Sequence, residues 1–172
     1  MRDVAAIVEL LNRAHLDLLE ACAELPASRW KRAPGKGRWS AGEVLAHLTM
    51  VETAVWTGAR EELSRKPGKH PLWKRVHVPV ALTSWRGIKR KTPVPLDFSL
   101  VREREEALEG YSAARARTLK LLAQHSSRDL APFRRTHPFL GSLNLYDWMR
   151  VLAYHEIRHT KQIREIGKTF QS

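Results

Sequence analysis

Three histidines have the residue type and the spacing that a divalent metal site requires. His155 and His159 are four residues apart, so on a helix their rings project from one face about one turn apart. His47 lies far away in the sequence, on the apolar stripe of another predicted helix, and helical proteins build metal sites from facing helices. We therefore predict a metal site formed by His47, His155 and His159. The alternative is that these histidines are buried and satisfied by hydrogen bonds alone.

Such a site would have a definite chemistry. Three neutral imidazoles leave a divalent ion its full positive charge, and an open fourth position lets the ion lower the pKa of a bound water or thiol. Imidazole ligands suit zinc, nickel, iron and copper alike, so the ligand set does not choose the metal.

A glutamate on the same predicted helix is a further candidate. The string HEIRH, from His155 to His159, matches the H-E-x-x-H motif of zinc peptidases. The thirteen residues after His159 supply neither a third histidine nor the later glutamate helix of those enzymes, which argues against that class. Glu156 lies about 100° round the helix from His155 and about 60° from His159. We name Glu156 as a candidate catalytic base or as an acceptor behind a ligand; a solvated glutamate paired with a neighbouring cation is the alternative.

The first half of the chain predicts two amphipathic helices. Over residues 3–25 the apolar residues recur at intervals of three, four and seven, which is the period of one helix face. A second helix is predicted to begin at Ser40, because Ser40 and Glu43 form an S-x-x-E capping box. Its apolar stripe continues toward Leu63 and includes His47.

The second half predicts two more helices. One extends over residues 99–125 with Ser99 as its N-cap. After a loop that contains HPFLG, the last helix is capped by Asn144, and Gly167 fits a C-terminal stop. No β-strand pattern competes with these elements. We expect an all-α protein, an antiparallel four-helix bundle with a long crossover between helices 2 and 3, forming one domain over residues 1–172.

The predicted crossover carries much of the charge of a basic chain. Thirty Lys and Arg against 18 Asp and Glu give a net charge of +12, and residues 65–91 contain nine basic residues and no acidic one. Trp73 and Trp85 in this segment permit nucleic-acid binding, with cations on phosphates and aromatic rings on bases. No recognised nucleic-acid-binding motif accompanies the charge, and tryptophans in such a loop are usually core anchors. We expect an anionic small-molecule substrate rather than nucleic acid. A short helix is predicted within residues 78–85.

The compartment follows from cysteine usage and hydropathy. Cys22 is the single cysteine and cannot form an intramolecular disulfide, and we interpret it as an inert small hydrophobe. The N-terminal segment has no signal-peptide core, and no stretch is long and apolar enough to span a membrane. The expected location is the cytoplasm.

Three segments together carry a resemblance to a known family. They are WSAGEVLAHLTMVE in the second predicted helix, HPFLGSLNLYDWM before the fourth, and YHEIRHTKQIREIG within the fourth. In this order they resemble the DinB/YfiT-like superfamily, and the resemblance extends over the whole chain. It implies a four-helix bundle that holds a divalent metal, usually nickel or zinc.

The resemblance also implies ligands. Family members use one histidine of the second helix and two of the fourth, which correspond here to His47, His155 and His159. Gln162 and Ile163 match the glutamine–isoleucine step that commonly follows the last ligand. Relatives often form homodimers through the bundle.

The activity that the resemblance implies is less specific. Characterised relatives include transferases and isomerases that use mycothiol, bacillithiol or glutathione, and the metal is thought to activate this low-molecular-weight thiol as a thiolate. A metal-bound thiol is deprotonated near neutral pH and is then the better nucleophile. We expect a thiol-dependent transferase acting on an anionic or electrophilic small molecule. The alternatives are a metal-dependent hydrolase and a non-catalytic bundle that binds anions or nucleic acid.

Overall fold

A computed structural model describes residues 4–67, 78–85, 87 and 100–170 of the chain. Long helices dominate it, and the prediction of a helical protein is confirmed. The helices are α1 (Val4–Ala23), α2 (Ala41–Leu63), α3 (Arg104–Gln124) and α4 (Leu145–Thr169), with short 3-10 helices η1 (Ala27–Arg29) and η3 (Val80–Ser84) and strands β1 (Arg134–His137) and β2 (Gly141–Asn144).

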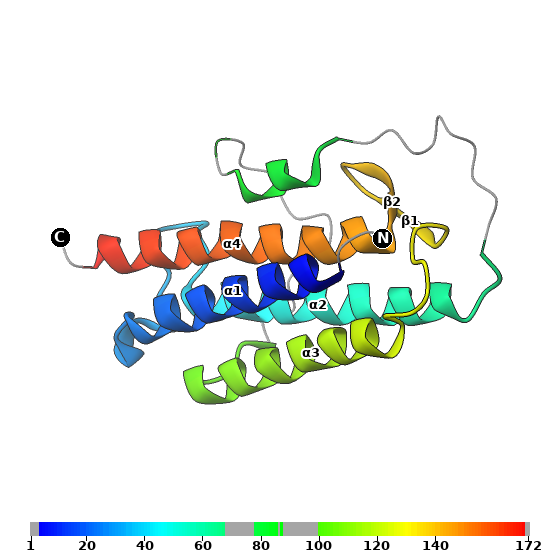
Figure 1. Cartoon of the computed structure of the whole chain (residues 1–172). Coiled ribbons are helices and arrows are strands. Elements are labelled where there is room, and N and C mark those ends of the chain that lie inside the picture. The colour runs from blue at the N-terminus through cyan, green and yellow to red at the C-terminus, as the bar shows by residue number, and fades with distance from the viewer. Residues whose placement is uncertain (1–3, 68–77, 86, 88–99, 171–172) are drawn as a thin grey trace.

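The four long helices lie side by side (Figure 1). Helix α1 packs along α4, α2 packs along α3, and α2 also contacts α4. Helices α1 and α4 run in one direction, and α2 and α3 run in the other (Figure 1). Helix α1 is therefore parallel to α4 and antiparallel to α2 and α3. Because α2 and α3 run the same way, the end of α2 and the start of α3 lie at opposite ends of the helices, as the predicted crossover requires (Figure 1). Most of the segment that connects them lies outside the described residues.

Two predicted helix starts are confirmed, and they belong to α2 and α4, the helices that carry the candidate histidines. At α2 the backbone N–H of Glu43 donates to Oγ of Ser40 at 3.2 Å, and the N–H of Ser40 donates to Oε2 of Glu43 at 2.6 Å. At α4 the N–H of Asp147 donates to Oδ1 of Asn144 at 3.0 Å. These caps satisfy N–H groups that a helix start leaves without partners.

Two other predicted helix ends are wrong. Helix α3 begins at Arg104, with Glu103 as its N-cap and no side-chain cap bond; the expected cap, Ser99, lies outside the described residues. Helix α4 continues past Gly167 to Thr169. A glycine stop requires a left-handed backbone conformation, and among the described glycines only Gly37 and Gly141 have positive φ.

The segment before α4 is a β-hairpin, although no strand was expected there. Strands β1 and β2 pair antiparallel, with His137 opposite Gly141. Gly141 has φ of +84°, a conformation that glycine adopts without a steric penalty and that alternation of apolar residues does not reveal. The hairpin holds the start of α4: the N–H of Leu145 donates to the carbonyl of Phe133 at 3.0 Å, and Nε1 of Trp148 donates to the carbonyl of Arg135 at 3.2 Å.

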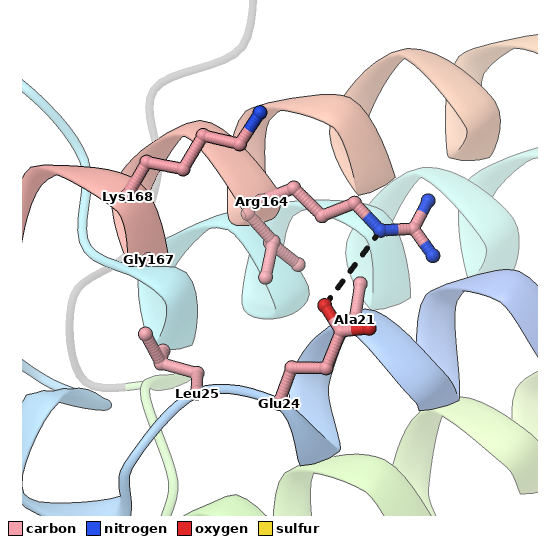
Figure 2. Close-up of a pocket in the computed structure, with 7 residues that line it drawn as sticks. Ala21, Glu24, Leu25, Arg164, Gly167 and Lys168 are labelled. Atoms are coloured by element: carbon pink, nitrogen blue, oxygen red, sulfur yellow. Dashed lines mark ion pairs between the residues drawn. The ribbon is translucent and has the colours of Figure 1, made fainter. Parts of the chain in front are cut away.

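A pocket lies between the C-terminal parts of α1 and α4 (Figure 2). Arg164 at its edge bonds to Asp17 at 2.7 Å and pairs with Glu24 at 3.9 Å. None of the three candidate histidines lines this pocket. The ion pairs are solvent-exposed links between α1 and α4, and such pairs contribute little to stability.

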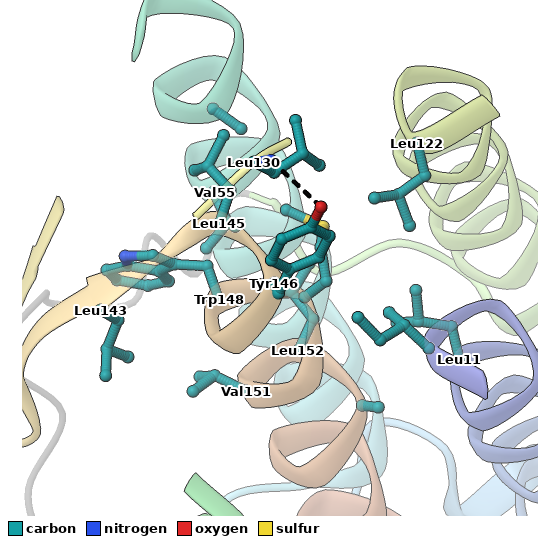
Figure 3. Close-up of a cluster of buried hydrophobic side chains, with 14 of the residues drawn as sticks. Leu11, Val55, Leu122, Leu130, Leu143, Leu145, Tyr146, Trp148, Val151 and Leu152 are labelled. Atoms are coloured by element: carbon teal, nitrogen blue, oxygen red, sulfur yellow. Dashed lines mark hydrogen bonds between the residues drawn. The ribbon is translucent and has the colours of Figure 1, made fainter. Parts of the chain in front are cut away.

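The apolar core consists of two clusters that follow each other along the helices. The first includes Leu11, Val55, Leu122 and Leu152, and it surrounds the Tyr146 ring, whose hydroxyl accepts from the N–H of Leu130 at 3.1 Å (Figure 3). The second lies nearer the opposite ends of the helices, and its members include Leu18, Trp30, Leu45, Tyr111 and Ile163. Between the two clusters the helices carry buried polar side chains, among them Glu52, Arg115 and Glu156.

Little of the basic crossover is described. The short helix expected within residues 78–85 is present as η3, which packs on α4. Trp85 at its end is 59% exposed, so the interpretation of this tryptophan as a core anchor is wrong. Trp73 and most basic residues of 65–91 lie outside the described residues. Within the described ranges, no helix combines the length and the apolar character needed to cross a membrane.

Candidate metal centre

The structure brings the three candidate histidines together. Nε2 of His47 lies 3.3 Å from Nε2 of His155, and Nε2 of His159 lies 3.2 Å from the same atom. One ring nitrogen from each residue lies within 4.8 Å of the other two. Three ring nitrogens thus converge on one point, which is the arrangement of a three-imidazole metal site.

Two helices supply these rings. His47 is on α2, two turns after the capping box, and is buried; His155 and His159 are on α4, one turn apart. His155 is half-buried and His159 is buried. The rings of Trp39 and His47 lie 5.1 Å apart, and Trp39 also stacks on His159 at 6.4 Å. Trp39 therefore forms an aromatic wall on one side of the centre.

The electrostatics favour the neutral form of every ring. Burial lowers the pKa of His47 from 6.5 to about 4. Burial, and then the charge that His47 would carry, lower the pKa of His155 to about 3. The pKa of His159 is also well below its ordinary value, chiefly through burial and then through His155 and His47. Metal binding requires neutral imidazole, so these side chains need not lose a proton at neutral pH before they bind.

Gln162 orients one of the rings. Nδ1 of His159 lies 2.9 Å from Oε1 of Gln162, and with the proton on Nδ1 the lone pair of Nε2 faces the other two rings. A hydrogen bond of this kind fixes the tautomer of a ligand and raises its basicity. Nδ1 of His47 is buried and makes no hydrogen bond within the described residues. Three lone pairs that face one another repel unless a cation lies between them, so these residues fit a divalent ion.

Glu156 lies in a different environment from the one expected of a solvated glutamate. Its side chain is 0% exposed, so the interpretation of Glu156 as a solvated glutamate is wrong. Its Oε2 pairs with Nη2 of Arg115 at 2.9 Å, and its Oε1 lies 3.4 Å from Nδ1 of His15. Its carboxylate therefore contacts Arg115 and His15 and does not contact the three candidate ligands.

Sequence reasoning missed the partners of Glu156. Arg115 is 2% exposed, and its Nε and Nη2 donate to the two carboxylate oxygens of Glu52 at 3.0 and 3.1 Å. Glu52 is 1% exposed. The sequence does contain a signal for the burial of Glu52, which lies four residues after Leu48 and three before Val55 on the apolar stripe of α2. A charged residue at such a position is buried and needs a partner.

The other residues considered from the sequence have plainer surroundings. Cys22 is fully buried, and burial raises the pKa of its thiol to about 12, in agreement with an inert small hydrophobe. Nδ1 of His137 accepts the N–H groups of Phe139 and Leu140 at 3.1 and 3.2 Å. His15 has a structural role, because its ring contacts Glu156 at 3.4 Å and Ser112 at 3.1 Å.

The fold and the site define a helical protein with a three-histidine candidate metal centre between α2 and α4. The chain matches the DinB superfamily over residues 10–163 and belongs to that superfamily. A curated relative is the uncharacterized protein YuaE of Bacillus subtilis (strain 168). It is 25% identical over 172 aligned residues, which cover 95% of this chain and 99% of that protein. The comparison supports a shared family and names no reaction.

Proposed function

We propose that this protein is a metal-dependent enzyme in which His47, His155 and His159 bind one divalent ion. The convergence of their Nε2 atoms within hydrogen-bonding distance supports the proposal most strongly. Three protein ligands leave a tetrahedral ion one open position. When bound there, the ion would lower the pKa of a thiol or a water and stabilise it as the anion.

The finer reading is a thiol-dependent transferase. Zinc or nickel is the proposed metal, a low-molecular-weight thiol the proposed co-substrate, and an anionic or electrophilic small molecule the proposed substrate. Burial supports this chemistry, because a centre between packed helices excludes much of the water that would compete with a thiol. Metal-dependent hydrolysis at the same centre is the alternative that the assay below separates.

Two further expectations accompany the proposal. We propose that the four helices form the DinB-type bundle, with residues 1–172 as one domain that acts in the cytoplasm as a homodimer. A catalytic role for Glu156 stays a prediction. Its burial and its pairing with Arg115 favour a positioning role.

Metal content tests the proposal directly. The native protein and the variants His47→Ala and His155→Ala should be purified without an affinity tag and analysed by elemental mass spectrometry. The matched control is His125→Ala, because His125 lies at the C-terminal end of α3 and outside the three-histidine group. We expect near-stoichiometric metal in the native protein and the control and a loss of metal in both site variants.

Turnover then separates the reaction classes. Consumption of a model electrophile that depends on both metal and added thiol supports the transferase, whereas metal-dependent hydrolysis without thiol supports the hydrolase. A native protein that holds no metal, even after reloading with zinc or nickel, would overturn the proposal.

A further inference from the structure

A buried charged cluster joins all four long helices next to the candidate metal centre. We define the charged cluster by its members: His15 of α1, Glu52 of α2, Arg115 of α3 and Glu156 of α4. Arg115 is at its centre: it hydrogen-bonds to Glu52 and forms an ion pair with Glu156, whose Oε2 accepts no hydrogen bond within the described residues. Single guanidinium groups seldom connect so many elements, because few sites offer several acceptors in one plane.

The guanidinium of Arg115 is bonded on every nitrogen. Its Nε and Nη2 bind Glu52 in a bidentate pair, and Nη2 also pairs with Glu156. Its Nη1 donates to the backbone carbonyl of Leu11 at 2.8 Å, and its Nη2 contacts the hydroxyl of Tyr111 at 3.1 Å. The planar fork of arginine fixes direction as well as distance in such a network. A side chain held this way tolerates little rotation or translation of the surrounding helices.

The two carboxylates lie on the two helices that carry the candidate ligands. Glu156 directly follows His155 and precedes His159 by three residues, and Glu52 follows His47 by five. Arg115 therefore connects α2 and α4 close to the level at which their histidines meet. Consecutive Cα atoms are about 3.8 Å apart, so a shift of Glu156 also shifts His155.

Stability alone explains the charged cluster poorly. Burying two carboxylates and a guanidinium carries a large desolvation cost, and an apolar replacement of similar volume often stabilises a protein more. Buried ion pairs are best attested as devices that fix the register of packed helices. Here the register matters, because three imidazole nitrogens must meet within a few ångströms.

We infer that Arg115 and Glu52 are positioning residues of the candidate metal centre. Together with Glu156 they hold α2 and α4 at the rotation and register that bring Nε2 of His47 to those of His155 and His159. This inference rests on the proposed function, since it assigns a role toward the metal that the histidines would bind. No member of the charged cluster is one of the three candidate ligands.

Cobalt binding tests the inference without an activity assay. Co²⁺ is the probe because its visible absorption reports ligand number and geometry. The variants are Glu52→Gln, which keeps the side-chain shape, and Arg115→Lys, which keeps the charge and loses the fork. We expect each variant to bind Co²⁺ about 10-fold or more weakly than the native protein, the cost typical of lost groups behind metal ligands. The Co²⁺ absorption bands should also shift.

A matched control is available at the surface of the same helix. Arg164 also forms ion pairs from α4, with Asp17 of α1 and with Glu24 just after the end of α1 (Figure 2). Its side chain is a third exposed. Arg164→Lys should leave the Co²⁺ affinity and absorption spectrum unchanged. Circular dichroism and urea unfolding must show that each variant is folded under the binding conditions, so that a loss of affinity is not a loss of folded protein.

The outcomes separate this inference from the proposed function. A native protein that binds no Co²⁺, zinc or nickel overturns the proposed function. A native protein that binds, beside a folded Glu52→Gln variant of equal affinity and unchanged spectrum, overturns the positioning role and leaves the proposed function standing. If Arg115→Lys fails to fold, Glu52→Gln decides alone. An equal loss in Arg164→Lys would also overturn the inference, because any interhelical ion pair would then suffice.

Discussion

The metal-free protein should lose stability in mild acid because His47 is buried as a neutral ring. Its pKa is lowered from 6.5 to about 4 in the folded protein. Between these two pH values the unfolded chain binds a proton at His47 and the folded chain does not, so the free energy of unfolding falls as the pH falls through this window. From about pH 7.5 to about pH 5, His47 alone should lower that free energy by about 2 kcal/mol. His155 acts in the same direction, since its pKa is lowered to about 3.

The comparison of the native protein with His47→Gln isolates this contribution. Glutamine is polar and does not titrate, so the variant should lose about 2 kcal/mol less between the two pH values than the native protein does. The assay is urea unfolding followed by far-ultraviolet circular dichroism, in the presence of a chelator. Carboxylates that also titrate in acid affect both proteins alike and cancel in the difference. Equal pH dependences in the two proteins would refute the reasoning that burial keeps His47 neutral.

Three further predictions concern single side chains. Gln162→Leu should weaken metal binding about 10-fold or more in a competition titration, because it removes the oxygen that accepts the hydrogen bond from Nδ1 of His159. An unchanged affinity would show that this hydrogen bond does not orient the ring. Gly58→Ala should stabilise the protein by about 1 kcal/mol in an Arg135→Ala background and by less in the native one, because a Cβ at position 58 would lie 1.3 Å from Nη1 of Arg135 and the guanidinium would have to move. Urea unfolding that shows additive effects would contradict this. Cys22 should resist Ellman's reagent at neutral pH until the protein is unfolded, since its pKa is raised to about 12 and it is fully buried; rapid labelling of the native protein would contradict it.

The parts of the structure that sequence predicted well are those set by local chemistry. The capping box at Ser40 and the cap at Asn144 fix the first turns of α2 and α4 through bonds that span three residues. From these starts the helical period carries His47 to the inner face of α2 and places His155 and His159 on a single face of α4. The meeting of the three rings then required that α2 and α4 be neighbours, which the resemblance to the DinB/YfiT-like superfamily implied, and that the two helices pack at the right rotation and register.

The parts that sequence reasoning missed depend on partners far apart in the chain. Arg115 and Glu52 are 63 residues apart and Arg115 and Glu156 are 41 apart, so no local spacing predicts their bonds. A charged residue on an apolar stripe indicates that its side chain is buried, but it does not identify the residue that pairs with it. The hairpin before α4 was missed for a related reason. Its strands are identified by their pairing with each other and by the positive φ of Gly141, and neither can be read from the sequence pattern.

The placement of the polar side chains between two apolar clusters has a physical consequence for a cation. Along α4 the sequence passes from Leu152 of the first cluster, through the histidines and Glu156, to Ile163 of the second. The charged cluster and the histidines therefore share one layer with a low effective dielectric, where electrostatic interactions act with little screening. The three imidazoles add no positive charge to that layer, because burial lowers their pKa values and keeps them neutral. A chain that carries +12 overall can therefore still present a cation with an uncharged set of ligands in its interior.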